Sequence, residues 1–194
     1  PLFLTNGERT LAEIIQIYEF ENRSRTNWRG VIRNFKILEK AGYVKLNYKR
    51  TFTKDDILRD LRKAGVKEGG ALLVHSSLFA VGPLENGAED LFKALEEAVG
   101  ERGTLCLPSF AYNTTKANES AYNPETTLSR VGTLTNLFWR RDGVKRSRHP
   151  SHGLAAKGPQ ADFILADNVD DGPYDIRGAF GKLYQLDATI LMLG

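Results

Sequence analysis

The sequence predicts an α/β fold: a three-layer α/β/α sandwich with a mostly parallel central sheet, preceded by a small helix–strand segment. Residues 71–74 form an uninterrupted apolar run, which is typical of a strand covered on both faces. Residues 103–108 predict a second buried strand around the apolar residues 105–107, and an amphipathic helical pattern lies between the two. This strand–helix–strand order favours parallel pairing through a right-handed crossover.

The first fifty residues predict a separate small module. Thr10 and Glu13 form a capping-box pattern that starts one helix, and residues 28–40 carry a second helical pattern that ends near Gly42. Residues 43–48 alternate as a half-exposed strand does. A helix followed by a basic strand resembles the recognition helix and wing of a winged-helix module, although only two helices are evident where that module has three. The cations that could meet DNA phosphates are Arg23, Arg25, Arg29, Arg33, Lys36, Lys45, Lys49 and Arg50. Packing or dimerisation is the favoured interpretation of this module.

Residues 51–194 predict the main domain. Thr53 caps a helix with two acidic residues in its first turn, and Gly65 ends it. A helix beginning after Gly87 and ending at Gly100 separates the two apolar strands. The chain then continues with a long polar loop over 109–130, a helix near 134–138, a helix over 159–166 and a final strand over 188–193.

Composition limits the function classes. No apolar run approaches the length of about 20 residues that a membrane span needs, and the start of the chain lacks the pattern of a signal peptide. The single cysteine, Cys106, excludes an internal disulfide framework, so we expect a reducing, cytoplasmic environment and a packed thiol. The net charge of +3 fits an anionic ligand but also plain solubility. A chain that starts at proline and stops where a strand enters a loop predicts a fragment.

Two stretches could carry chemistry. His75, Ser76 and Ser77 follow the first buried strand, at the end where open α/β sheets collect ligands. The alternative is that these serines only satisfy the turn. Five cations lie close together at Arg140, Arg141, Lys145, Arg146 and Arg148. They could clamp phosphates, or they could form a solvated basic turn.

Other catalytic motifs find little support. His149 and His152 have a spacing that two metal ligands can share, but no third ligand is evident, so we expect no metal. Ser76 or Ser77 could pair with a histidine as in a hydrolase, yet the sequence has no Gly-x-Ser-x-Gly motif. Walker and Gly-x-Gly-x-x-Gly loops are also absent from the sequence.

Several short motifs occur together in one order. They are His75-Ser76-Ser77-Leu78, residues 83–87, 103–105 and 108–110, the Tyr122-Asn123-Pro124-Glu125-Thr126-Thr127 segment, Phe138-Trp139-Arg140, and residues 143–150, 155–161 and 191–194. In this order they resemble the aminoglycoside 3-N-acetyltransferase family, from about Thr53 to the last residue. Each motif alone is weak evidence for the family, and the resemblance rests on finding the motifs together in the family's order.

The resemblance implies an acetyl-CoA-dependent N-acetyltransferase that acetylates a primary amine of an aminoglycoside or related amino sugar, usually by direct transfer with a general base. Acetyl-CoA would be the cosubstrate, and a homodimer is left open. The residues implied for acetyl-CoA are His75, Ser76, Ser77, Leu78, Arg146, Ser147 and His149. The loop over 109–130 would border the acceptor, with Phe110, Tyr112 and Tyr122 as its contacts.

The sequence departs from the family in two places. In the family, the histidine that acts as the general base lies in a segment that would follow Gly194. The general base is therefore unassigned here and is expected beyond that position. Gly153 stands where the family has a serine, which puts a local contact in doubt. Two other functions therefore stay open: a catalytically incomplete binding or scaffold protein, and a DNA-binding regulator that uses residues 1–50. An acidic acceptor site would come from Asp167, Asp170, Asp171 and Asp175, or these residues form a solvated loop.

Overall fold

The chain divides into two compact units, residues 1–50 and 51–194. The computed structural model describes residues 11, 13–15, 19, 27–46, 51–111, 122–166, 172 and 174–193. In that described part, no helix is both long and apolar enough to cross a membrane.

Helix α2 (Trp28–Lys40) is the main element of the first unit. The Asn27 side chain caps it by accepting a hydrogen bond from the Gly30 amide at 3.2 Å, and Phe35 is buried on its inner face. The strand predicted over residues 43–48 is wrong for residues 43–46, which have no strand geometry. There the Leu46 amide donates to Glu39 Oε1 instead of to a neighbouring strand. A strand forms only where another strand edge is available to pair with it, and the described residues of this unit offer none.

A five-stranded sheet forms the centre of the second unit, in the order β3-β4-β2-β1-β5. Its strands are β1 (Ala71–Ser76), β2 (Thr104–Pro108), β3 (Lys145–Arg146), β4 (Leu154–Lys157) and β5 (Thr189–Leu193). Strand β1 pairs in parallel with β2 and β5, but β4 pairs antiparallel with both β2 and β3. The sheet is therefore mixed, whereas the sequence predicted a mostly parallel one. The connection 147–153 is too short for a crossover, so β3 and β4 can only be antiparallel.

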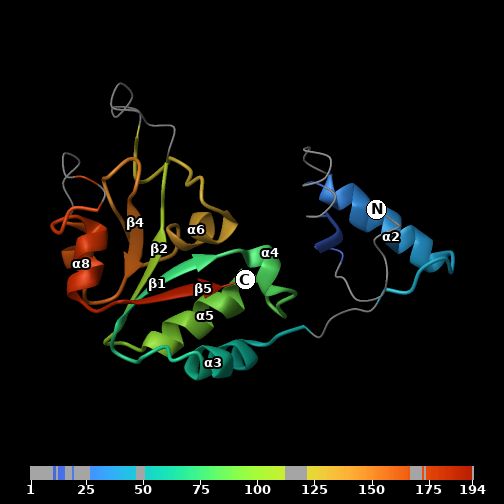
Figure 1. The fold of residues 1–194 in the computed structure, drawn as a ribbon, viewed down its shortest axis with the longest axis horizontal. Coiled ribbons are helices and arrows are strands. Elements are labelled where there is room, and N and C mark those ends of the chain that lie inside the picture. Colours follow the sequence, from blue (N-terminus) through green and yellow to red (C-terminus); the bar gives the residue numbers. More distant parts are fainter. Residues whose placement is uncertain are drawn as a thin grey trace. The chain divides into compact units, whose positions relative to one another are not determined.

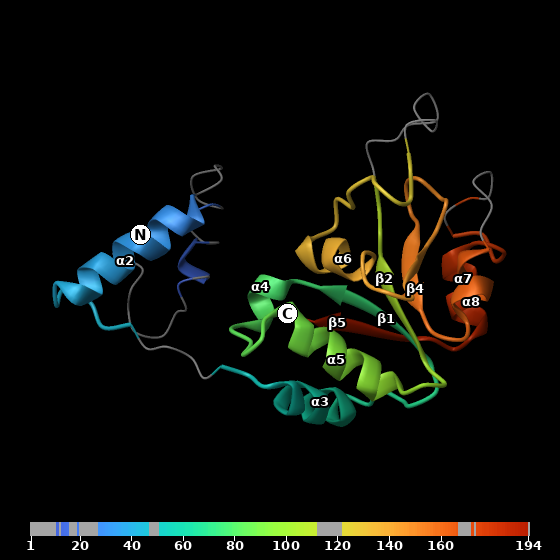
Figure 2. The same cartoon turned by 180° about the vertical axis from the view of Figure 1, so that it is seen from behind.

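Helices cover both faces of this sheet (Figures 1 and 2). Leu72, Val74, Leu105 and Leu107 point to one face, where they pack in a core with residues of α3 (Lys54–Lys63), α5 (Ala88–Val99) and α6 (Thr133–Phe138). The alternate residues Leu73 and Cys106 point to the other face, under α7 (Ala161–Leu165) and α8 (Ala179–Gln185). Two buried cores on opposite faces of one sheet give the three layers.

Cys106 lies in the second core, fully buried and unpaired. Burial raises the pKa of its thiol to about 12, because the thiolate would lose its hydration. The sequence-based interpretation of Cys106 as a packed thiol is therefore confirmed.

Local signals for the helices are largely confirmed. Thr53 and Asp56 form a reciprocal capping box at the start of α3, and Gly65, at φ 88°, follows its end. Gly87 and Gly100 flank α5 as predicted. Helix α7 is shorter than the predicted 159–166, and the sequence did not predict α4 (Leu78–Val81), α8 or the strands β3 and β4.

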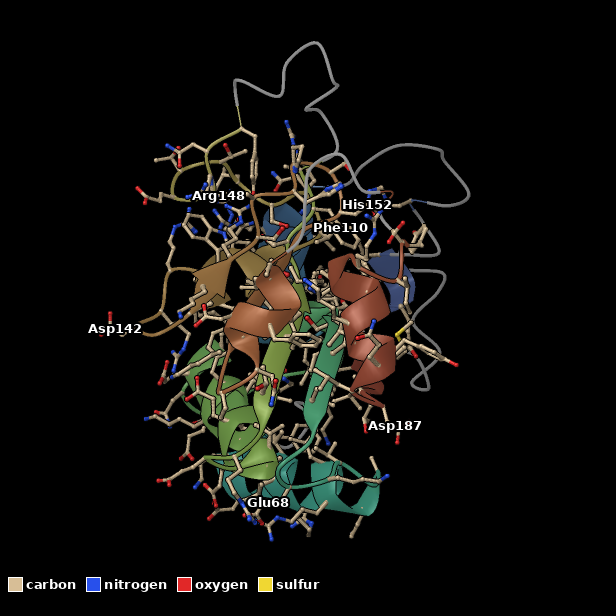
Figure 3. All side chains as sticks on the ribbon, turned by 90° about the vertical axis from the view of Figure 1, so that its left-hand side faces the viewer. Glu68, Phe110, Asp142, Arg148, His152 and Asp187 are labelled. Carbon is tan, nitrogen blue, oxygen red and sulfur yellow. The ribbon has the colours of Figure 1, made fainter. Side chains whose placement is uncertain are left out.

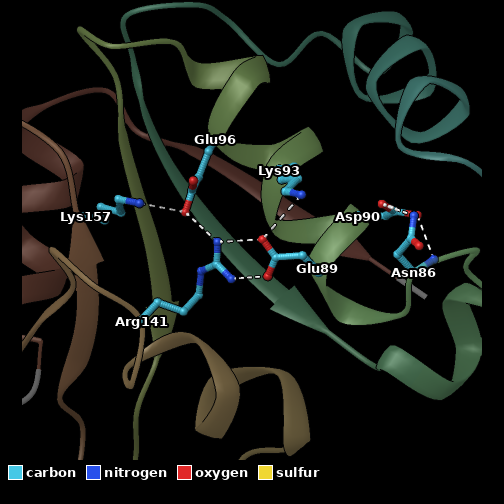
Figure 4. A network of polar contacts seen from close by, with 7 residues as sticks. All are labelled: Asn86, Glu89, Asp90, Lys93, Glu96, Arg141 and Lys157. Carbon is cyan, nitrogen blue, oxygen red and sulfur yellow. Dashed lines mark hydrogen bonds and ion pairs between the residues drawn. The ribbon is translucent and has the colours of Figure 1, made fainter.

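A network of ion pairs fastens α5 to the turn after α6 and to β4 (Figure 4). Arg141 donates two hydrogen bonds to the Glu89 carboxylate and lies 3.7 Å from a carboxylate oxygen of Glu96. Lys157 of β4 donates to that same oxygen at 3.1 Å. The Arg141 guanidinium also lies over the Phe92 ring, 4.6 Å from its centroid. These contacts connect charged side chains of α5, β4 and the turn after α6.

The Arg141–Glu89 contact predicts an acid-dependent loss of stability. Hydrogen bonding by Arg141 lowers the pKa of Glu89 below its usual 4.5. The stabilisation is therefore complete above pH 4.5 and is lost as the pH falls through the lowered folded-state pKa. Glu89→Gln should lower the urea midpoint at pH 7, and the gap to the parent protein should narrow below pH 4.5. A gap of constant size down to acid pH would contradict this assignment.

Candidate functional site

One edge of the sheet gathers the residues that the sequence singled out. The parallel strands β1, β2 and β5 end there, β3 ends there at Arg146, and the antiparallel β4 begins there. Figure 3 shows Phe110, Arg148 and His152 at this end of the molecule, with Glu68 and Asp187 at the opposite end. Ligands of open α/β sheets bind at the carboxyl ends of the strands. This carboxyl edge is therefore the candidate site.

The end of β1 has a partly structural role. Ser77 begins the short helix α4: its hydroxyl accepts from the Ala80 amide at 3.4 Å, and its own amide donates to the Leu193 carbonyl at 2.9 Å. Leu78 packs against the first core. His75 and Ser76 are half-buried, and Gly132 lies close to the Ser76 carbonyl oxygen. The interpretation that the serines satisfy the turn thus applies to Ser77.

Arg146, at the end of β3, connects the sheet edge to the turn 124–127. Its Nε donates to the Ser109 hydroxyl at 2.6 Å. Its Nη1 donates to the backbone carbonyls of Pro124 at 2.9 Å and Thr127 at 2.6 Å. One side chain therefore holds the ends of both β2 and β3 together with that turn.

Two aromatic rings flank the same guanidinium. It lies 4.7 Å from the centroid of the Trp139 ring and 5.5 Å from that of Tyr122. Tyr122 is held in place because its hydroxyl donates to the Ser147 carbonyl at 2.9 Å. Trp139 follows α6, so the guanidinium is enclosed by residues from three separate segments: Ser109, residues 122–127 and Trp139.

The charge of Arg146 has no partner of opposite sign in the described part of the chain. Its hydrogen-bond acceptors are a hydroxyl and two carbonyls, and no carboxylate there makes an ion pair with it. Its Nη2 is buried and has no hydrogen-bond partner among the residues that the structure describes. Burial lowers the pKa of the guanidinium, because the cation loses hydration without a nearby anion. A half-buried cation with an unpaired donor is an arrangement that an anionic ligand can complete.

The turn between β3 and β4 is held by its own side chains. Ser147 is buried, and its hydroxyl accepts from the His149 amide at 2.9 Å. His149 is also buried, and its Nδ1 accepts from the His152 amide at 3.2 Å. A Cβ at Gly153 would lie 2.7 Å from the His149 carbonyl oxygen, so the turn as folded has no room for a serine there. The departure from the family at Gly153 is thus matched by local packing.

Of the three residues expected to contact the acceptor, Phe110 is buried, Tyr122 packs beside Arg146, and the structure does not describe Tyr112. Phe110 is only 9% exposed and lies beneath His152 and Phe180, with ring centroids 5.3 and 6.1 Å away. Tyr122 points toward Arg146 and Ser147. Tyr112 lies outside the described residues.

The expected acetyl-CoA residues form two groups on one edge. Arg146, Ser147 and His149 lie together at β3 and the turn that follows it, whereas the group His75–Leu78 follows β1. Strands β4 and β2 lie between β3 and β1, which separates the groups by about 14 Å at ordinary strand spacing. Only an extended ligand could reach both. Ser109 and Trp139, which enclose Arg146, belong to two of the motifs that carry the family resemblance, but the sequence predicted no site role for either.

Metal binding has no visible basis in the described ranges. No group of three or more His, Cys, Asp or Glu side chains is placed there to hold an ion. His149 and His152 instead face each other edge to face, with ring centroids 6.4 Å apart.

Known proteins resemble the second unit of the chain. The family model for aminoglycoside 3-N-acetyltransferase matches residues 73–194, which include most of β1, the Arg146 region and β5. The chain belongs to the aminoglycoside 3-N-acetyltransferase family. Aminoglycoside N(3)-acetyltransferase IV of Salmonella sp is 38% identical over 141 residues, covering 73% of this chain and 53% of that protein. The corresponding enzyme VII of Streptomyces paromomycinus is 31% identical over 161 residues, covering 73% of this chain and 55% of its own length.

Solved members of the family share the fold. The apoenzyme structure of aminoglycoside acetyltransferase AAC(3)-IVa superposes with a TM-score of 0.69 at 35% identity. That match covers 76% of this chain and 57% of the AAC(3)-IVa chain. This member of the aminoglycoside 3-N-acetyltransferase family therefore spans little more than half the length of the relatives it matches.

Proposed function

We propose that this chain provides the acetyl-CoA-binding edge of an N-acetyltransferase that acetylates a primary amine of an aminoglycoside or related amino sugar. The observation that carries the proposal is Arg146: a half-buried guanidinium whose buried Nη2 donor has no hydrogen-bond partner and which has no anion beside it among the described residues. Coenzyme A carries phosphates, and an arginine that lacks a counter-ion binds such groups well.

Family membership supplies the reaction class. Two AAC(3)-IVa structures, 33% and 34% identical to this chain, hold apramycin and a gentamicin, respectively. A more distant protein of the same fold, AAC-IIIb, has been solved as a binary complex with CoASH, at 24% identity and a TM-score of 0.66. These ligands belong to those proteins, and they support the choice of substrate class proposed for this chain.

The proposed roles follow the two groups on the edge. Arg146 would bind a phosphate through Nη2, next to Ser147 and His149 in the β3–β4 turn. At β1, His75, Ser76, Ser77 and Leu78 would contact a more distant part of the same extended cofactor. Phe110, Tyr112 and Tyr122 remain the proposed neighbours of the acceptor.

The chemistry of the proposed reaction divides between cosubstrate and protein. Acetyl-CoA, when bound, supplies an acetyl thioester, and the amine attacks its carbonyl carbon. The chain's residues bind and orient that cosubstrate at the sheet edge. A general base must also take a proton from the amine. No residue of this chain is assigned that role.

The alternative function, a DNA-binding module in residues 1–50, remains a prediction.

Calorimetric titration of the full chain tests the proposal. We expect saturable binding of coenzyme A that weakens as salt is raised, because phosphate contacts are screened. Pantetheine, which lacks the phosphates that Arg146 would bind, should bind at least ~10-fold more weakly. Equal affinity for the two compounds, or no binding of either, would refute the proposed use of this edge.

A further inference from the structure

The β3–β4 turn places a serine hydroxyl between two imidazoles. Ser151 Oγ lies 3.0 Å from His152 Nδ1 and 3.4 Å from His149 Nδ1. The shorter distance is within the range that serine nucleophiles and their histidine bases show. Ser151 and His152 are both half-buried, so neither is sealed in the core.

The neighbouring hydrogen bond limits the serine proton to two directions, and the tautomer of His152 decides between them. The His152 amide donates to His149 Nδ1, so that nitrogen carries no proton. If His152 Nδ1 is also bare, Ser151 donates to it at 3.0 Å. If His152 Nδ1 is protonated, it donates to Ser151, whose own proton then points to His149 Nδ1 at 3.4 Å. In either tautomer an imidazole nitrogen receives the serine proton.

Aromatic packing holds the His152 ring in position. Phe110 lies 5.3 Å from it and Tyr174 lies 5.9 Å from it, measured between ring centroids. Burial, and secondarily the nearby His149, lowers the pKa of His152 below its usual 6.5. The ring is therefore neutral near pH 7 and can accept a proton. Among the described residues, His149 and Tyr174 are titratable groups that pack against it.

We propose that Ser151, with His152 as its base, is an acyl-accepting nucleophile that cleaves activated esters and acyl thioesters. This activity goes beyond the proposed amine acetylation, and it requires no amine acceptor. The sequence had suggested Ser76 or Ser77 as the serine of such a pair, whereas the fold places Ser151 there.

The reaction is balanced without any further co-reactant except water. Ser151 Oγ attacks the acyl carbonyl carbon while His152 takes the hydroxyl proton. The bond from that carbon to the leaving oxygen or sulfur breaks, and the leaving group departs with the proton from His152. Water then attacks the acyl-serine ester and gives a proton to His152. The bond from the acyl carbon to Ser151 Oγ breaks, His152 returns the proton to Oγ, and the carboxylic acid is released.

The test uses p-nitrophenyl acetate and acetyl-CoA in parallel with the full chain. With p-nitrophenyl acetate we expect a burst of nitrophenol, and one added acetyl group on the peptide that contains Ser151 after acid quench and mass spectrometry. The rate should rise with pH through an inflection below 6.5, where His152 loses its proton. No label on Ser151, or label only on other residues, would overturn the proposal.

Matched variants separate chemistry from folding. Ser151→Ala should remove the label, and His152→Phe should slow acylation by ~100-fold or more while it keeps a ring between Phe110 and Tyr174. Thr133→Ala removes an exposed hydroxyl elsewhere and should leave the rate unchanged. If Ser151→Ala reacts like the parent protein, the proposal is wrong. The reaction of p-nitrophenyl acetate does not depend on recognition of coenzyme A. If p-nitrophenyl acetate labels Ser151 and acetyl-CoA does not, the result supports the Ser151–His152 dyad and counts against the proposed acetyl-CoA site.

Discussion

Replacing Arg146 with glutamine is expected to weaken coenzyme A binding by ~10- to 100-fold, which corresponds to the loss of a charge-assisted hydrogen bond. The free Nη2 donor and the unbalanced charge of Arg146 are the features that a phosphate would satisfy. Glutamine keeps a donor of similar reach but removes the charge. Titration calorimetry of the parent and variant chains measures the change.

A second effect of the substitution has to be separated from the first. Arg146 also holds Ser109, Pro124 and Thr127, so its loss could release the turn 124–127. Ser109→Ala removes only the Nε contact and keeps the charge, so it should cost little affinity for coenzyme A. Emission from Trp139, whose ring lies 4.7 Å from the guanidinium, reports whether the enclosure has changed.

The matched control for Arg146 is its neighbour Arg148, an exposed arginine in the same basic segment. If the phosphate is held at a specific site, Arg148→Gln should alter affinity by less than ~3-fold, as screened surface charges do. Equal losses for the two variants would show that only general positive charge matters. Unchanged binding in Arg146→Gln would remove the main support for the proposed function.

Elements with local signals were predictable from the sequence. The Thr53 capping box, the glycines at 87 and 100 and the apolar runs at β1 and β2 each act within a few residues, so their structure follows from short-range sterics and burial. The same holds for Cys106, whose apolar neighbours already indicated a packed thiol.

Elements that depend on distant partners were missed. Strand β4, with the sequence Leu-Ala-Ala-Lys, has no β-branched residue and becomes a strand because β2 and β3 pair on either side of it. Strand β3 is only two residues long and lies in a basic segment that looks like a turn. Helix α8 contains Gly181 and follows a polar stretch, which weakens its helical signal.

The candidate site shows the same division. Arg146 was identifiable from its basic segment and from the family resemblance, because both are properties of neighbouring residues. Its environment was not, since Ser109, Tyr122 and Trp139 come from segments that meet only in the folded chain. The pairing of Ser151 with His152 likewise depends on the conformation of the β3–β4 turn.

The largest expected effect on stability comes from Gly158→Ala, which should lower the free energy of unfolding by at least ~3 kcal/mol. Gly158 follows β4 and has a φ of 134°, a conformation that side chains rarely adopt. An added Cβ would lie 2.3 Å from the Gly103 carbonyl oxygen and 2.7 Å from the Thr104 Cα. Those are backbone atoms of the segment entering β2, so the clash can be relieved only by moving a central strand. Urea denaturation followed by circular dichroism measures the loss.

Gly143 provides the control that separates strain from collision. It also has a positive φ, 76°, but the nearest atom to an added Cβ is the flexible Lys157 Cε at 3.7 Å. Gly143→Ala should therefore lower the free energy of unfolding by only about 1 kcal/mol, from backbone strain alone.

Because Lys157 pairs with Leu105 near the start of β2, Gly158 lies at the opposite end of the strands from Arg146. Coenzyme A affinity of the folded Gly158→Ala fraction should then match that of the parent chain. If Gly158→Ala and Gly143→Ala lowered the free energy of unfolding equally, the backbone near Gly158 would move easily to make room for a Cβ. That result would contradict the close packing of β4 against β2.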